Sequence, residues 1–161
     1  MSRRVAALGV PLLVSVVAGA AAGVVWQLVA PTGRVVVARG LVVATGDTEL
    51  AAAQDATFVV VTAAAGLLAG AWLTAAPSRS PLVRATGVVV GGLLGSLVAW
   101  AVGARLGPPS VAAQQATGVE QLQSPLDLSS YGALGVWSAV AAAVAFAGLL
   151  VTGLIGGRNR R

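Results

Sequence analysis

Four long stretches without a charged residue constrain the fold of this chain more than any other feature. They cover residues 5–30, 56–76, 85–104 and 132–156. A helix needs about 20 apolar residues, at 1.5 Å per residue, to cross roughly 30 Å of hydrocarbon, and each stretch has that length. Inside lipid a segment must satisfy its own backbone hydrogen bonds, so helices are expected despite the many valines. The stretches predict an all-α integral membrane protein, a bundle of four transmembrane helices in one membrane domain.

The composition agrees with this fold class and excludes several kinds of chemistry. Of the 161 residues, 57% are hydrophobic and 9% are charged, whereas soluble domains carry about 25% charged residues. The chain has neither cysteine nor histidine, which excludes disulfides, thiol chemistry, histidine-ligated haem and the usual zinc sites. Its arginines lie in short flanks between apolar runs, which favours a lipid bilayer over nucleic acid as the partner of this basic chain. We predict no cofactor, no metal site and no nucleic-acid partner.

The arginines are divided unevenly between the two sides of the predicted bundle. Seven lie at the chain ends or between the second and third stretches, and three lie in the two long loops, residues 31–55 and 105–131. All five acidic residues lie in these loops as well. Because arginine-rich flanks stay in the cytoplasm, both termini are predicted to be cytoplasmic and both long loops to lie outside a bacterial plasma membrane.

The four tryptophans fall near the predicted ends of the spans. Trp26 and Trp100 close the first and third spans on the outer side, and Trp137 opens the fourth span there. Trp72 closes the second span on the inner side. Aromatic side chains gather at the headgroup level of a bilayer, so all four are predicted to be interfacial anchors.

Small residues recur at every fourth position of the predicted helices. Helices in lipid associate through close backbone approach at such residues. We predict that they pack one four-helix bundle, and the alternative is that a second copy or a partner helix docks on the third span. The short connection Pro77–Arg84 also predicts that the second and third helices are antiparallel neighbours. The candidate packing residues are Gly66, Gly70, Gly87, Gly91, Gly95 and Gly103.

The first outer loop predicts a short β-hairpin followed by a helix start. Two β-branched runs flank Arg39-Gly40, and such runs around a glycine-containing pair are typical of a hairpin. A lone hairpin is marginal in water, so it should lie on the bilayer, pack on the second loop or pair with another chain. Asp47 and Glu49 suit a helix N-terminus, and capping explains them without a metal ion. The candidate recognition residues of this loop are Arg34, Arg39, Asp47, Glu49 and Asp55.

The second outer loop predicts less regular structure. Pro108 and Pro109 end the third helix, and residues 110–117 favour a short surface helix. The rest of the loop is predicted to be irregular, with Glu120 and Asp127 as isolated acids that have no partner base.

The spans lack the side chains that transport and catalysis usually need. No ionisable residue lies inside the four stretches, although pumps, carriers and voltage sensors place such groups at depth. No nucleophile–base pair, phosphate-binding loop or pair of carboxylates is present in the sequence. We therefore predict neither a self-contained transporter nor an enzyme.

Three short patterns resemble a known family. They are Trp26-x-x-x-Ala30-Pro31, Glu49 with Asp55-x-x-Phe58, and Gly91-Gly92-x-x-Gly95-Ser96-x-x-Ala99-Trp100. Together they resemble a group of small actinobacterial four-span membrane proteins of unknown function, over nearly the whole chain. The resemblance implies an actinobacterial plasma membrane and four helices, and it brings no assigned activity.

Three functions follow from the sequence, in descending order. The first is a structural or accessory subunit that binds another membrane component. The second is an oligomeric pore or transport-associated subunit, which predicts a homo-oligomer with a polar lining that few residues here can supply. The third is an enzyme of cell-envelope lipids that acts at the outer interface through Asp47, Glu49, Asp55 or Arg105.

Overall fold

Four long helices dominate the computed structural model of this chain. The structure describes residues 2–38, 41–44, 47–75, 81–117 and 122–158. The long helices are α1 (Ser2–Val29), α2 (Asp47–Ala75), α3 (Pro81–Leu106) and α5 (Val136–Arg158). Each of them is long and apolar enough to cross a membrane. The prediction of a largely helical chain with four such helices is confirmed.

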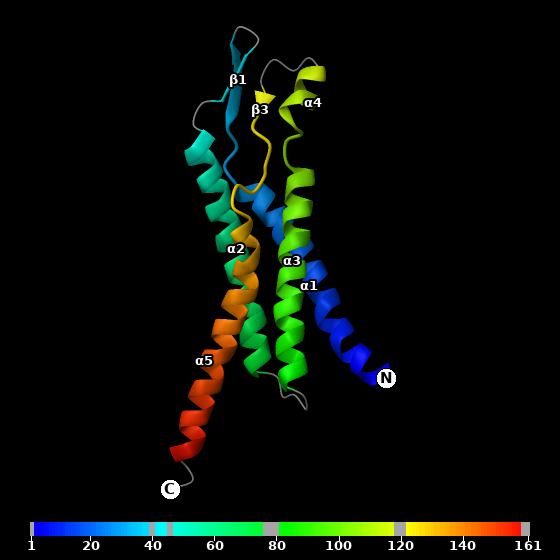
Figure 1. The fold of residues 1–161 in the computed structure, drawn as a ribbon, viewed down its shortest axis with the longest axis vertical. Helices are drawn as coiled ribbons and strands as arrows, with labels where there is room; N and C mark the ends of the chain where they lie inside the picture. The colour runs from blue at the N-terminus through cyan, green and yellow to red at the C-terminus, as the bar shows by residue number, and fades with distance from the viewer. Residues whose placement is uncertain (1, 39–40, 45–46, 76–80, 118–121, 159–161) are drawn as a thin grey trace.

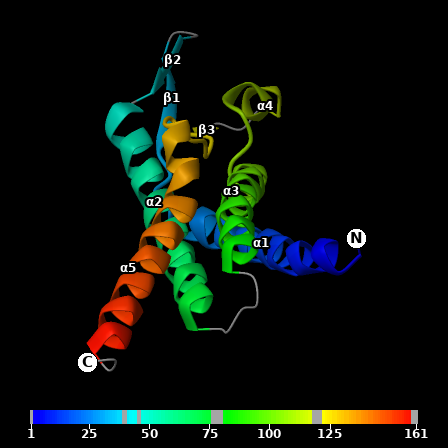
Figure 2. The same ribbon diagram turned by 60° about the horizontal axis from the view of Figure 1, so that its bottom comes forward.

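The long helices form two pairs that do not follow chain order. α1 packs along α3, α2 packs along α5, and contacts between α3 and α5 join the two pairs. Figure 2 shows α2 and α5 on one side of the molecule and α1 and α3 on the other. The predicted neighbourhood of the second and third helices is wrong in this respect, because α2 and α3 make far fewer contacts than either pair. The short connection brings two helix ends together, but glycine-rich surfaces decide which helices pack along their length.

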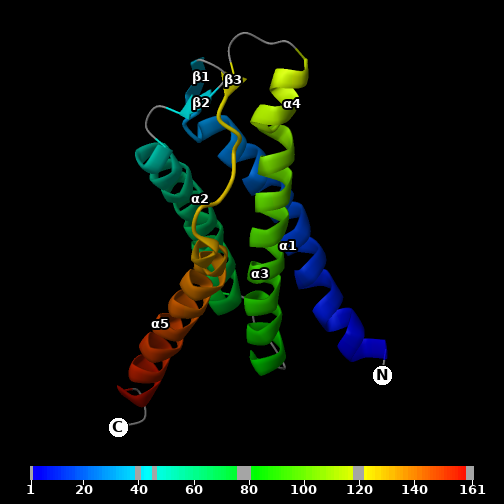
Figure 3. The same cartoon turned by 45° about the horizontal axis from the view of Figure 1, so that its top comes forward.

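The ends of the helices divide the molecule into two dissimilar ends. The start of α1, the end of α2, the start of α3 and the end of α5 all lie toward the same end of the molecule, where α1 and α5 diverge from the other two helices (Figure 1). The strands and the short helix α4 (Val111–Ala116) lie at the opposite end (Figure 3). We call the described parts of residues 31–44 and 107–130 the cap.

The cap contains a small antiparallel sheet built from both long loops. Its strands are β1 (Arg34–Ala38), β2 (Leu41–Ala44) and β3 (Leu122–Gln123), in the order β2-β1-β3. Val36 lies opposite Val43, and Val35 lies opposite both Ala44 and Leu122. The predicted turn of the hairpin, residues 39–40, lies outside the described residues. The first loop therefore packs on the second, which is one of the three arrangements expected for its apolar strands.

The cap also contains the short helix α4, which begins at a capping serine, and the last residues of the cap lead into a 3₁₀-helix. α4 follows Ser110, whose hydroxyl oxygen accepts a hydrogen bond from the backbone N–H of Ala113 at 3.4 Å. The 3₁₀-helix η1 (Tyr131–Gly135) leads directly into α5. The larger of the two buried apolar clusters joins the cap to the helices, since it includes Trp26 of α1, Phe58 of α2 and Leu126 of the cap.

Candidate functional site

Four of the six predicted packing glycines lie at close contacts between helices of this chain. A Cβ atom placed on Gly66 would lie 2.6 Å from the carbonyl oxygen of Trp137, and one on Gly95 would lie 2.8 Å from its ring. A Cβ on Gly70 would lie 2.8 Å from the carbonyl oxygen of Ala141. Gly103 faces the ring of Trp26, while Gly87 and Gly91 are buried in α3. Gly66, Gly70, Gly95 and Gly103 leave no room for a side chain, so helices of the same chain occupy the surfaces that these four residues form.

Two of the four tryptophans lie in the core instead of at an interface with lipid headgroups. Trp26 is 0% exposed, its indole N–H donates to the carbonyl oxygen of Gln54 at 3.1 Å, and its ring meets Phe58 edge-on at 4.9 Å. Trp137 is 3% exposed. Their prediction as interfacial anchors is corrected here, because position along a helix indicates depth but not the face on which a side chain lies. Trp26 fits inside because Gly103 leaves space for its ring and α2 supplies an acceptor.

The other two tryptophans keep exposed surface. Trp72 is 51% exposed near the end of α2. Trp100 is partly buried, donates its indole N–H to Oδ1 of Asp127 at 3.0 Å, and meets Tyr131 edge-on at 6.2 Å. Asp127 also accepts the backbone N–H of Leu128 at 2.8 Å. Asp127 therefore has two hydrogen-bond donors as partners, although neither of them is a base.

Asp55 joins α2 to the start of η1. Its Oδ1 accepts the backbone N–H of Ser129 at 3.0 Å, and its Oδ2 accepts that of Ser130 at 2.9 Å. These are the residues immediately before η1, so a carboxylate on α2 receives the backbone donors at the start of the η1–α5 helix. Negative charge is favourable at that end of a helix. This geometry gives Asp55 a structural role in the cap.

The remaining predicted recognition residues do not form a described cluster. Arg34 and Glu49 are exposed, on β1 and in the first turn of α2, and Arg105 is exposed in the last turn of α3. Asp47 is the first residue of α2. Arg39 and Glu120 lie outside the described residues. Among the residues that the structure describes, no group of three or more metal-binding side chains occurs.

Two glutamines that the sequence analysis did not single out organise the cap. The buried side chain of Gln114 donates from Nε2 to the carbonyl oxygens of Pro109, at 2.6 Å, and Gln123, at 2.8 Å, and its Oε1 accepts the backbone N–H of Gln123 at 2.8 Å. Gln54 donates from Nε2 to the carbonyl oxygen of Pro31 at 3.2 Å. The sequence signal that could have identified them is an amide side chain inside an alanine-rich helix. Such a side chain, if buried, needs hydrogen-bond partners. Both side chains pin loop backbone to a helix.

The described polar groups within the bundle mostly bond backbone carbonyls. Thr62 donates to the carbonyl oxygen of Phe58 at 2.8 Å, and Ser138 donates to that of Val89 at 2.7 Å. The buried hydroxyl of Ser96 has no hydrogen-bond partner among the described residues. Thr62 bonds within its own helix and Ser138 bonds to α3, and neither these two residues nor Ser96 lines the cleft described next.

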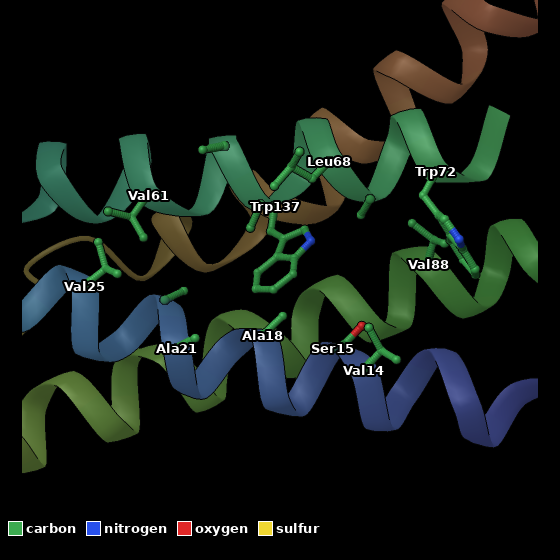
Figure 4. Close-up of a pocket in the computed structure, with 14 residues that line it drawn as sticks. Val14, Ser15, Ala18, Ala21, Val25, Val61, Leu68, Trp72, Val88 and Trp137 are labelled. Atoms are coloured by element: carbon green, nitrogen blue, oxygen red, sulfur yellow. The ribbon is translucent and has the colours of Figure 1, made fainter. Parts of the chain in front are cut away.

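An apolar cleft of about 580 Å³ separates α1 from α2. Its α1 wall includes Val14 and Ala18, its α2 wall includes Val61 and Leu68, and the Trp137 indole extends from α5 between the two helices (Figure 4). The cleft exists because each helix turns its glycines toward another partner. Gly19 and Gly23 of α1 lie against α3, while Gly66 and Gly70 of α2 lie against α5. Alanine and valine side chains are left facing each other across the space.

No protein-family model matches this chain, and no curated protein or solved structure matches it either. The resemblance to the small actinobacterial membrane proteins stays a prediction, and no relative lends its activity to this chain.

Proposed function

We propose that the protein is integral to a bacterial plasma membrane, with four helices across the bilayer and the cap outside. Large apolar side chains on the long helices support this proposal, since Leu13 is 66% exposed, Leu68 is 74% exposed and Phe146 is 64% exposed. Burying one such side chain away from water is worth about 1.5–3 kcal/mol, which lipid provides and water does not. Arg3 and Arg4 at the start of α1, Arg84 at the start of α3 and Arg158 at the end of α5 belong to helix ends opposite the cap, which supports cytoplasmic termini.

The absence of cysteine from the sequence offers a direct test of this topology. Single cysteines in place of Thr117, in the cap, and Ser2, at the start of α1, would be treated with a membrane-impermeant maleimide on intact cells. We expect labelling at position 117 only, with labelling at position 2 after the membrane is opened. The reverse pattern would contradict the orientation, and release of the protein by alkaline carbonate would contradict membrane insertion itself.

Within the membrane, the protein acts as an accessory subunit whose cap binds another membrane component. An extended segment of that partner pairs with β2 and so adds a strand to the sheet of the cap. The observation that carries this proposal is a difference between the two edges of the sheet. At the β3 edge, the backbone N–H and C=O of Gln123 both pair with the Gln114 side chain. At the other edge lies β2, which pairs only with β1 among the described strands. Proteins normally protect edge strands, and an open edge is a site where an extended segment of a partner pairs.

The ties between cap and bundle suit this role. Asp55 and Gln54 fix loop backbone to α2, so the open edge is carried on a rigid support. Loops held by a rigid scaffold are where binding usually resides. A partner that pairs with β2 would therefore be held at a defined distance above the bilayer.

Purification of the tagged protein from its own host tests the accessory role. After gentle solubilisation, native mass measurement and identification of bound proteins should give one partner in fixed stoichiometry. A homo-oligomer without any other protein would contradict the accessory role and favour the oligomeric pore.

Two proline variants then test the edge. Backbone N–H groups alternate in direction along a strand, so of Val42 and Val43 one directs its N–H toward β1 and the other toward the free edge. Proline at the edge-directed position should abolish partner binding and leave the thermal stability unchanged. Proline at the other position should lower stability as well. Retention of the partner by both variants would exclude strand addition at β2.

A further inference from the structure

The cleft between α1 and α2 is long and narrow. It runs from Val14 to Val25 on α1 and from Val61 to Trp72 on α2, which is about 17 Å on each helix at 1.5 Å per residue. A helix with its side chains is about 10–12 Å wide, so a single 5.4 Å turn fills roughly 400–600 Å³. The volume of about 580 Å³ therefore holds about one turn of a partner helix, whereas the length of the cleft spans three. A slimmer occupant fits better.

The dimensions of the cleft suit one unbranched hydrocarbon chain. Its volume spread over its length gives a mean cross-section of roughly 35 Å². Because non-bonded carbons approach to about 3.5–4.0 Å, an alkyl chain passes through such a section in contact with both walls. Alanine and valine supply most of the lining, and Ser15 carries the one hydroxyl in it. Val14 and Leu68 at the rim are 60% and 74% exposed, so the cleft opens sideways, where lipid would lie.

One end of the cleft faces the end of the molecule at which the helix-terminal residues Arg3, Arg4 and Arg84 lie. Trp72 lines that end, three residues before α2 finishes. Arg3 and Arg4 belong to the first turn of α1 and Arg84 to the first turn of α3, and these turns lie at the same end of the molecule (Figure 1). The seven arginines at the chain ends and in the connection have no acid among them. Tryptophan favours the headgroup level, and basic residues beside a span attract anionic headgroups.

We propose that this cleft binds one acyl chain of an anionic phospholipid, with the phosphate near Trp72 and the chain end near Val25 and Val61. Trp137 forms the back wall and closes the cleft toward α3 and α5 (Figure 4). The bound chain fills the space that α1 and α2 leave between them, because the glycines of these two helices face α3 and α5. This inference rests on the membrane insertion proposed above and is independent of any protein partner.

The test compares two alanine substitutions on α2. Ala64 and Ala71 are both exposed, and only Ala64 lines the cleft. Ala64→Phe therefore fills the cleft, while Ala71→Phe adds the same side chain outside it. Full-length protein would be reconstituted in vesicles of equal parts phosphatidylcholine and phosphatidylglycerol, extracted in mild detergent and weighed by native mass spectrometry. We expect one phospholipid per chain, enriched in phosphatidylglycerol, in the wild type and in Ala71→Phe, and its loss in Ala64→Phe.

A second measurement needs no extraction from the bilayer. Brominated acyl chains quench a tryptophan that they touch, and both Trp72 and Trp137 line the cleft. Fluorescence in vesicles of brominated phosphatidylglycerol should be quenched more in the wild type than in Ala64→Phe. If Ala64→Phe does not fold, Ala21→Phe fills the cleft from the α1 wall and replaces it, since Ala21 is also exposed and lines the cleft.

Three results would overturn the proposal. In the first, the wild type and the filled variant retain lipid equally and are quenched equally. In the second, neither protein retains lipid and both are quenched equally. In the third, lipid is retained without a preference for the anionic headgroup. Release of the protein by alkaline carbonate would instead overturn membrane insertion, and the absence of a protein partner would overturn only the accessory role.

Discussion

The cap and the helix bundle are held together by different forces. In the cap, side-chain amides and carboxylates form hydrogen bonds between segments far apart in the sequence; Asp55, for example, accepts from the backbone N–H groups of Ser129 and Ser130. In the bundle, backbone meets backbone at glycines such as Gly19 and Gly95, with few polar contacts. The comparison indicates that the surroundings of each region decide which interaction can stabilise it. Short loop segments cannot bury enough apolar surface to order themselves, whereas helices in lipid gain little from apolar contact and depend on close approach.

The largest effect is expected where the bundle packs most closely. A Cβ on Gly19 would overlap the backbone of Gly95, which cannot move aside without shifting α3. Gly19→Ala should therefore lower the free energy of unfolding by about 1–3 kcal/mol, as overpacking does. Gly9→Ala is the matched control, because nothing lies within 4 Å of that position. Unfolding in mixed detergent micelles measures both, and equal stability of the two variants would show that α1 and α3 do not pack here.

An effect of similar size but confined to the cap is expected at the closed edge of the sheet. Gln114→Ala removes three hydrogen bonds from a buried amide and leaves the N–H and C=O of Gln123 unpaired. We expect faster hydrogen exchange at Gln123 and a loss of about 1–3 kcal/mol that is confined to the cap. The exposed neighbour supplies the control, since Gln115→Ala should leave exchange unchanged. Unchanged protection in Gln114→Ala would mean that this edge is not closed by the amide.

The carboxylate that joins α2 to η1 should contribute less, since its hydrogen bonds are exposed. Asp55→Asn removes the charge and one of the two acceptors that face Ser129 and Ser130. The expected loss is about 1 kcal/mol, seen as a lower Tm of the solubilised protein. Glu49→Gln makes a similar neutralisation in the first turn of α2 without a described partner in the cap, and it should change Tm less. An equal effect of the two would assign the loss to charge alone.

The smallest effect is expected at the outer tryptophan. Trp100→Phe keeps an aromatic ring beside Tyr131 and removes the hydrogen bond to Asp127. We expect a loss of about 0.5–1 kcal/mol in the same unfolding assay. Asp127→Asn keeps an acceptor oxygen and should cost less than Trp100→Phe. The opposite order would mean that Asp127 acts mainly through the backbone N–H of Leu128.

Helix extents could be read from the sequence because they depend on local composition. The uncharged runs at 85–104 and 132–156 correspond to α3 (Pro81–Leu106) and α5 (Val136–Arg158). The acids at Asp47 and Glu49 also indicated that the second helix begins well before the uncharged run, as α2 does. Helix length and the first turn are decided by neighbours in the chain, so residue order is enough to predict them.

Which surfaces meet was decided only by the tertiary structure. The spans are apolar on all sides, so hydropathy does not indicate which face of a helix lies inward. Small residues marked the surfaces capable of close approach. They did not indicate that α1 packs along α3, or that Trp26 is enclosed between α3 and α2. The cleft follows from that pairing, because two helices whose glycines are engaged elsewhere leave a space between them. The local sequence determines where each helix begins and ends, and the competition among glycine surfaces determines which helices pack against each other.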